Sequence, residues 1–189
     1  MFFPVDIASE PAVAEMVRTI EGKWGTIDIL INNAGRLGPM SLIEAYPPSD
    51  WEELVRVNVL GTFLVTRFVL PLMRKQDLGR IIFMTSSLGR QGRSRWGGYV
   101  ASKFAIEGLM KTLAEETLGS GIRVMALNPE ATRTSMRAAA YPGEDPLRLK
   151  EPSEVANVLR YLAREDDPSL HGRSIDFTQA RSMMNALGE

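Results

Sequence analysis

Tyr99 and Lys103 are the first residues whose types and spacing suggest chemistry, because they stand four apart in a segment with helical periodicity. On a helix this spacing places both side chains on one face, with the ammonium near the phenol. A free tyrosine has a pKa of about 10, and a nearby cation favours its phenolate form. Tyr99 is therefore a candidate proton donor and acceptor near neutral pH. Alone the pair is weak evidence, since the spacing also arises by chance.

Three further polar positions support it. Ser86 follows the apolar segment 80–85, at the strand end where open α/β sheets place their ligands, so its hydroxyl is a candidate for holding a substrate oxygen. Asn58 stands in an apolar helical stretch, either as a functional amide or as a buried amide that bonds neighbouring backbone. The segment 32–35, Asn-Asn-Ala-Gly, lets the backbone approach a ligand or simply ends a strand.

The pattern of apolar residues predicts the strands and helices that would position these side chains. Short β-branched segments alternate with longer segments of helical spacing, which is typical of repeated βα units on a parallel sheet. The expected strands are Phe2–Ile7, Ile27–Ile31, Arg80–Thr85, Ile122–Leu127 and Ser174–Phe177.

Four helices are expected between the strands. The first follows Ser9 as N-cap and ends near Gly22; the second begins at Ser49 with Glu52 as a capping box and runs toward Pro71. The third covers 98–118, and the fourth begins at Ser153. The stretch 128–151 has no clear periodicity, and is either a substrate lid or a surface excursion with a short helix around 134–140.

Composition bounds the function. A chain of 189 residues with 44% hydrophobic and 24% charged residues indicates one globular domain. A net charge of -1 argues against binding to nucleic acid or to an anionic membrane. Zero cysteines and one histidine, His171, exclude thiolate and multi-histidine metal sites, so no metal is expected. No targeting signal or long uninterrupted apolar run is present, which predicts a cytoplasmic protein.

The motifs together resemble the short-chain dehydrogenase/reductase family, in order and approximate spacing, over almost the whole chain. The matching residues are Asn32-Asn33-Ala34-Gly35, Asn58, Ser86, Tyr99-Val-Ala-Ser-Lys103, Asn128-Pro129 and Thr134. The stretch 128–150 is most similar to the bacterial YciK-like oxidoreductases. The resemblance implies a Rossmann-like α/β fold, a doubly wound parallel sheet in three α/β/α layers, lacking the first two βα units.

The resemblance also implies an interconversion of a small-molecule carbonyl and alcohol. Tyr99 would exchange the proton of the substrate oxygen, Ser86 would hold the same oxygen, Lys103 would lower the pKa of Tyr99, and Asn58 would hold a water of the proton relay. The implied cofactor is NAD or NADP, without a preference between them. Its implied contacts are Asp6, Asn33, Ala34, Gly35, Tyr99, Lys103, Pro129 and Thr134.

Two departures from the family affect this expectation. Family members begin with a strand and a glycine-rich turn that binds the pyrophosphate, and no such turn precedes Asp6. We therefore expect weakened cofactor binding, and expect segment 2–7 to pair directly beside segment 27–31. Glu130 replaces the usual glycine, and its carboxylate either adds negative charge near the cofactor phosphates or points to solvent.

Two readings of the whole chain follow. The first is an oxidoreductase; the second is a catalytically silent interaction protein that keeps the helices around Asn58 and Tyr99 as an interface. Under either reading the resemblance implies a homo-oligomer formed through these helices. Arg90, Arg93 and Arg95, between Ser86 and Tyr99, either favour an anionic substrate or form a solvated loop.

Overall fold

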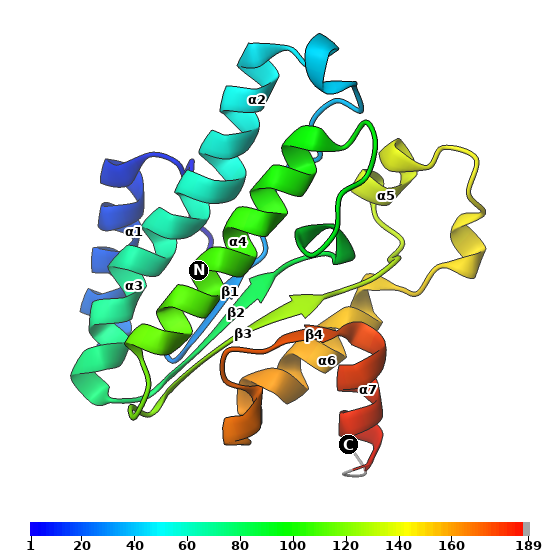
Figure 1. The fold of residues 1–189 in the computed structure, drawn as a ribbon. Helices are drawn as coiled ribbons and strands as arrows, with labels where there is room; N and C mark the ends of the chain where they lie inside the picture. Colours follow the sequence, from blue (N-terminus) through cyan, green and yellow to red (C-terminus); the bar gives the residue numbers. More distant parts are fainter. Residues whose placement is uncertain (187–189) are drawn as a thin grey trace.

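The computed structural model of the chain describes residues 1–186 and contains a parallel sheet of four strands in the order β1-β2-β3-β4. Each strand pairs with the next along the chain, so the sheet grows in one direction (Figure 1). The carboxyl ends of the strands consequently lie along one edge, where the connecting loops gather. The strands are β1 (Ile29–Asn32), β2 (Gly79–Met84), β3 (Ile122–Asn128) and β4 (Ser174–Asp176).

Helices connect and cover the strands. A π-helical turn, η2 (Arg56–Gly61), joins α2 to α3 in one long helical segment. The α-helices are α1 (Glu10–Trp24), α2 (Pro48–Val55), α3 (Thr62–Gln76), α4 (Gly97–Glu116), α5 (Ser135–Ala140), α6 (Pro152–Arg164) and α7 (Phe177–Ala186).

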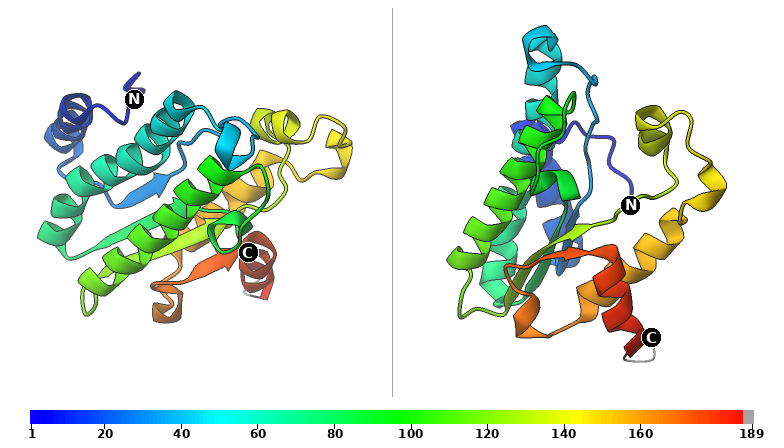
Figure 2. Two further views of the ribbon diagram at one scale, coloured as in Figure 1. Left: turned by 45° about the horizontal axis from the view of Figure 1, so that its top comes forward. Right: turned by 45° about the vertical axis from the view of Figure 1, so that its right-hand side comes forward.

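Successive side chains of β2 point to opposite faces of the sheet, and each face has its own hydrophobic core. Ile81 and Phe83 are fully buried against α1, α3 and α4 on one face of the sheet, whereas Ile82 and Met84 pack with α6 and α7 on the other. This period-two pattern is what a strand covered on both faces requires. Figures 1 and 2 show the helices on the two sides of the sheet. The expected doubly wound, three-layer α/β/α arrangement is confirmed.

The expected strand 2–7 is wrong. Within the described residues β1 pairs only with β2, and residues 1–6 have no regular secondary structure. Pro4 has no N–H for a ladder, and Asp6 turns the chain by accepting a hydrogen bond from the Ala8 N–H at 2.9 Å. Ile7 packs directly on Gly61, where an added Cβ would come within 2.6 Å of it. Packing on the π-helical turn therefore replaces pairing with the sheet.

Two expected helix signals also differ. Ser49 does not cap the second helix, which begins at Pro48 with no side-chain cap, so the Ser49–Glu52 capping box is absent. This helical segment continues through Pro71 to Gln76, because Val69 and Met73 on either side of the proline are buried in the core. Burial of these side chains offsets the hydrogen bond that a proline removes.

The stretch 128–151 contains the short helix α5, as one of the two expectations stated, and the 3-10 turn η4 (Pro146–Arg148). Thr134 is the N-cap of α5, and its Oγ1 accepts a hydrogen bond from the Arg137 N–H at 3.1 Å. Helix α7 begins where the expected strand 174–177 was to end, and the sequence analysis did not anticipate it.

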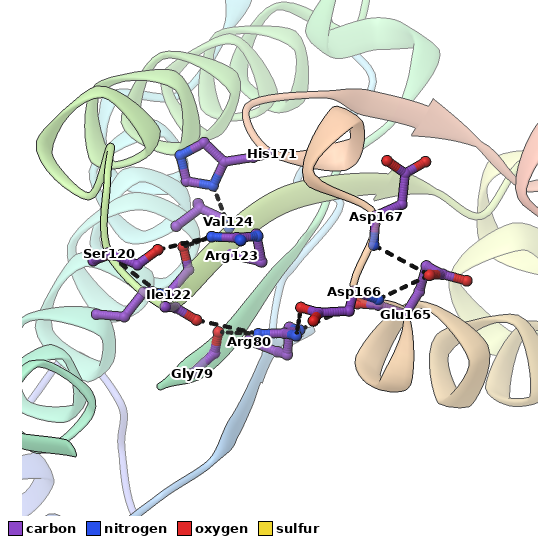
Figure 3. Close-up of polar contacts among 11 residues, drawn as sticks. Gly79, Arg80, Ser120, Ile122, Arg123, Val124, Glu165, Asp166, Asp167 and His171 are labelled. Carbon is purple, nitrogen blue, oxygen red and sulfur yellow. Dashed lines mark hydrogen bonds and ion pairs between the residues drawn. The ribbon is translucent and has the colours of Figure 1, made fainter. Parts of the chain in front are cut away.

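Polar contacts at the amino ends of the strands hold the opposite edge of the sheet together (Figure 3). The nearly buried Arg80 donates to the Asp166 carboxylate at 2.6 Å and to the Gly79 carbonyl. His171 accepts from the Val124 N–H at 3.2 Å and its other ring nitrogen lies 2.8 Å from the Ala114 carbonyl, which links β3 to α4. The only histidine of the sequence is thus used in packing, far from the strand ends that carry the loops.

The combined helix Pro48–Gln76 is long and apolar enough to cross a membrane by length and composition. In this fold its side chains Leu54, Leu64 and Val69 are buried in the domain. A core helix passes the same compositional test, so this feature by itself is weak evidence for a membrane span.

Candidate active site

A cleft of about 1030 Å³ opens at the carboxyl ends of β1, β2 and β3. Its floor is formed by the loops that follow these strands, and α4, α5 and α6 contribute its walls. This is the edge where open parallel sheets bind ligands. Among the expected site residues, those that line it are Asn33, Ala34, Gly35, Ser86, Tyr99, Lys103, Pro129 and Thr134.

Tyr99 lies in the first turn of α4, mostly buried beside Trp96, with the two ring centroids 5.9 Å apart in an edge-to-face contact. Lys103, one turn further on, is 9% exposed, and its Nζ lies 5.6 Å from the centre of the Tyr99 ring. The helical spacing therefore produces the shared face that the sequence predicts. Ser86 meets them from the end of β2, and its Oγ accepts from the Leu88 N–H at 3.2 Å.

Burial has the largest effect on the pKa values of Tyr99 and Lys103. It raises the pKa of Tyr99 above its ordinary value, and a hydrogen bond with the Ser86 hydroxyl opposes this rise only in part. The lowering of the Tyr99 pKa that the resemblance attributes to Lys103 stays a prediction. The Lys103 ammonium donates to the Met84 carbonyl at 2.7 Å. Burial lowers the pKa of Lys103 to about 8, although Glu107 raises it.

Glu107 is a site residue that the sequence analysis missed. It lies one turn beyond Lys103 on α4 and is 4% exposed. Its Oε1 accepts from the Thr85 hydroxyl at 2.7 Å and from the Ser174 hydroxyl at 2.8 Å, whereas its buried Oε2 has no hydrogen-bond partner among residues 1–186. The carboxylate thus ties α4 to β4 and to the residue that follows β2, next to Ser86. A glutamate four residues after a candidate lysine is the signal that points to it.

Asn58 does not line the cleft, and both amide donors of its side chain are used. Its Nδ2 donates to the Arg36 carbonyl at 2.9 Å and to the Ser102 hydroxyl at 3.0 Å, and its Oδ1 accepts from the Arg36 N–H at 2.7 Å. The amide therefore joins the loop after β1 to α4. This is the buried amide bonding backbone that the sequence left open, and the holding of a relay water by Asn58 stays a prediction.

We predict that Asn58→Ala lowers the free energy of unfolding by about 1–3 kcal/mol, because the part-buried backbone groups of Arg36 and the buried Ser102 hydroxyl lose their partner. Urea denaturation of the purified variant measures the change. Asn157→Ala, an identical truncation at an exposed position of α6, is the control and should shift stability by less than about 0.5 kcal/mol. Equal stabilities for the two variants would contradict the bracing role.

Asp6 also lies outside the lining of the cleft. Its carboxylate pairs with the Arg56 guanidinium at 2.7 Å, and its pKa is lowered chiefly by the hydrogen bond from Ala8. Gly35 lies next to Asn58 in the 33–35 loop, and a Cβ added there would stand at an ordinary contact distance of 3.5 Å from Asn58 Oδ1. The 33–35 loop therefore contacts the Asn58 amide and also lines the cleft.

Glu130 has a left-handed backbone with a φ of 56°, a conformation that favours glycine. This explains physically why a glycine suits the position. Its carboxylate is bound by Thr178 in the first turn of α7. It accepts from the Thr178 N–H at 3.2 Å and from the Thr178 hydroxyl at 2.9 Å. Part of the residue still lines the cleft.

The three arginines between Ser86 and Tyr99 have different positions. Arg90 pairs with Asp176, which also accepts from Asn128. Arg93 lines the cleft, whereas Arg95 does not and has a left-handed backbone with a φ of 69°. The sequence could not separate these three.

Comparison with known proteins agrees with this geometry. A family model described as short chain dehydrogenase matches residues 1–145. The chain is 40% identical over 167 residues to the uncharacterized oxidoreductase YciK of Escherichia coli K12, covering 88% of this chain and 66% of that protein. It is 33% identical over 181 residues to the 3-oxoacyl-[acyl-carrier-protein] reductase FabG of Thermotoga maritima, covering 92% of this chain and 73% of that one.

Solved structures give the same result. An Escherichia coli CFT073 protein complexed with NADPH superposes with a TM-score of 0.86 at 38% identity, covering 92% of this chain and 72% of that one. The chain thus spans roughly two thirds to three quarters of the length of these relatives. The family match covers most of the 189 residues and includes Ser86, Tyr99 and Lys103. This chain therefore belongs to the short-chain dehydrogenase/reductase family.

Proposed function

We propose that the chain acts as an NAD(P)-dependent oxidoreductase that interconverts a carbonyl and an alcohol, with Tyr99 as its acid and base. One observation carries the proposal: the Tyr99 phenol, the Ser86 hydroxyl and the Lys103 ammonium line the same cleft at the carboxyl ends of the strands. The membership of the family and the oxidoreductase and reductase names of its relatives support the same reaction class.

In the direction of reduction, Tyr99 donates its proton to the carbonyl oxygen as negative charge develops there. Burial raises the pKa of Tyr99, so the phenol is protonated at neutral pH and ready to donate. Ser86 donates its O–H to the same oxygen, while its Oγ accepts from the Leu88 N–H. Lys103 contributes a positive charge below the phenol, where it stabilises the phenolate that remains after proton transfer.

The residues of the cleft suit a nicotinamide cofactor, which supplies the hydride when bound. Lys103 would bind the nicotinamide ribose, the small side chains of the 33–35 loop would allow close backbone approach of the cofactor, and Pro129 and Thr134 would border the nicotinamide; all of these residues line the cleft. The cofactors NADP and NADPH appear with solved relatives at 37% and 38% identity, which makes NADPH the first cofactor to test. Asp6, paired with Arg56 outside the cleft, would contact the adenine end only from the rim.

Titration with NADPH and NADH, followed by nicotinamide fluorescence and by calorimetry, tests the proposal. We expect saturable binding of at least one of them at micromolar concentrations, and reduction of members of an aldehyde and ketone panel. No binding at about millimolar concentration would overturn the proposal and favour the silent interaction protein. The cytoplasmic location, and the absence of nucleic-acid and membrane partners, stay predictions.

We also propose self-association through the helices that carry Asn58 and Tyr99. Large apolar side chains on these helices are exposed: Leu60 and Phe63 on the η2–α3 segment and Phe104 on α4 are each more than 40% accessible. Exposed large apolar side chains are typical of a protein interface. None of these three residues lines the cleft.

Phe104→Glu should weaken this association at least about tenfold, because it places a charge in an apolar contact. Light scattering with size-exclusion chromatography over a concentration series measures the shift in mass. Leu147→Glu, which changes an apolar residue on η4 that is 81% exposed against 47% for Phe104, is the control and should leave the mass unchanged. A wild-type chain that is monomeric throughout would contradict the proposal.

A further inference from the structure

The end of the cleft beyond Tyr99 has an apolar, aromatic wall. A cluster of buried and partly buried residues from separate segments forms it: Leu37, Leu88, Trp96, Tyr99, Val100, Ala140 and Tyr141. The rings of Trp96 and Tyr141 lie 5.8 Å apart between centroids and tilted by 35°. Flat apolar groups pack well on such surfaces. A substrate with its carbonyl at Tyr99 would therefore rest its body against these rings.

The cations of the cleft are not equivalent. The cleft-lining residues include three, Arg93, Lys103 and Arg137. Arg137 forms two hydrogen bonds of 2.6 Å with the Glu144 carboxylate, which satisfy its charge. Lys103 is buried and donates to the Met84 carbonyl. Arg93 has no carboxylate within 4 Å among the described residues.

Arg93 is instead held by aromatic groups. Its guanidinium lies 5.2 Å from the centre of the Trp96 ring and 5.4 Å from that of Tyr141, and it donates a hydrogen bond to the Tyr141 hydroxyl. These aromatic contacts hold the guanidinium in place without neutralising its charge. Four of its five N–H donors have no protein acceptor in these contacts. The side chain is exposed at the cleft rim and accessible to a ligand.

The two acids of the cleft do not compete for Arg93. The Glu130 carboxylate is bound by Thr178, and the Asp176 carboxylate is bound by Arg90 and Asn128. Arg93 therefore combines an unneutralised charge, N–H donors left for a ligand and an adjoining apolar wall. A carboxylate matches the fork geometry of a guanidinium with two parallel hydrogen bonds.

We propose that the substrate is an aldehyde or ketone, or the matching alcohol, with a flat apolar body and a carboxylate group, and that Arg93 binds this carboxylate. The body packs on Trp96 and Tyr141, and the carbonyl lies at Tyr99 and Ser86. This proposal rests on the proposed function for its redox chemistry. In reduction the carbonyl carbon gains a hydride from reduced nicotinamide, and the carbonyl oxygen gains a proton from Tyr99, so the product is the hydroxy acid.

A binding experiment tests Arg93 without any turnover. Calorimetry compares 4-(hydroxymethyl)benzoate with 4-methylbenzyl alcohol, which is neutral and of similar shape. We expect the wild-type chain to bind the carboxylate at least about tenfold more tightly, and Arg93→Met to lose this preference while its affinity for the neutral alcohol changes by less than about threefold. Arg93→Lys should keep only part of the preference, because an ammonium lacks the fork.

Arg95→Met is the matched control, since Arg95 belongs to the same loop but does not line the cleft. It should retain the full preference for the carboxylate. Thermal unfolding of every variant should match the wild-type chain, which shows that lost binding does not come from unfolding. A preference that survives in Arg93→Met, or that is absent from the wild-type chain, would overturn the proposal.

Kinetics separate this proposal from the proposed function. With NADPH, kcat/KM for 4-carboxybenzaldehyde relative to 4-methylbenzaldehyde should fall about tenfold in Arg93→Met. If neither aldehyde is turned over but the binding preference depends on Arg93, the carboxylate site stands and the oxidoreductase function fails. If both aldehydes are reduced equally well by the wild-type chain and the variant, the function stands and the assignment of Arg93 is wrong.

Discussion

Tyr99→Phe is expected to lower kcat for carbonyl reduction by about 10²–10⁴-fold while the affinity for NADPH changes by no more than about twofold. The substitution removes one oxygen and leaves the ring, so the contact with Trp96 at 5.9 Å is preserved. Only the proton donor is lost. Steady-state kinetics of NADPH oxidation with an aldehyde that the wild-type chain reduces, together with calorimetric titration of NADPH, separate the two quantities.

The control for this substitution is Tyr46→Phe. Tyr46 is outside the main cleft, and its buried hydroxyl has no hydrogen-bond partner in the structure. Removing that hydroxyl leaves no group unpaired, so neither turnover nor stability should fall. If Tyr99→Phe retained the wild-type kcat, Tyr99 would not be the acid, and the proton would have to come from Ser86 or from solvent.

Lys103→Met is expected to lower turnover at least about 100-fold and yet to raise the free energy of unfolding at pH 7 by about 1–3 kcal/mol. Both effects come from removing the Lys103 charge. Turnover falls because the Tyr99 phenolate loses this charge, and stability rises because the charge is buried. The Lys103 ammonium is almost fully buried, and this burial lowers its pKa from 10.5 to about 8. The folded state therefore bears a cost for keeping the charge. Methionine fills a similar volume without that charge, although the hydrogen bond to the Met84 carbonyl is lost.

The stability difference should depend on pH in a defined direction. Below pH 8 lysine is charged in both the folded and the unfolded chain, and the full cost of the buried charge is present. Between about pH 8 and 10.5 the unfolded chain binds more protons, so the stability of the wild-type chain rises relative to that of Lys103→Met. The advantage of the variant should therefore shrink across this range.

Urea denaturation at pH 7 and at pH 9.5 measures this shrinkage, and the exposed Lys111→Met variant on the same helix is the control. Lys111→Met should change stability by less than about 0.5 kcal/mol at both pH values. If Lys103→Met were less stable than the wild-type chain by the same amount at both pH values, the buried ammonium would not lower the free energy of unfolding.

Much of the fold could be predicted from the sequence because its signals are local. The β-branched segments 80–85 and 122–127 read as strands, and the structure places buried strands there within one residue at each end. The four-residue spacing of Tyr99 and Lys103 predicts that both lie on one helix face, and both lie on α4. The segment 2–7 looks equally like a strand, but a strand also needs a neighbour, and Ile7 packs on Gly61 instead.

Which residues stand at the strand ends and on the facing helix follows from local patterns, because periodicity and turn chemistry act over a few residues. The bonds of Asn58 to Arg36 and Ser102 depend on packing, since these residues are 22 and 44 positions away from it. Burial, the largest influence on the pKa of Tyr99, depends on packing as well. Partner choice and desolvation depend on segments far apart in the chain, and no local pattern records which of them come together.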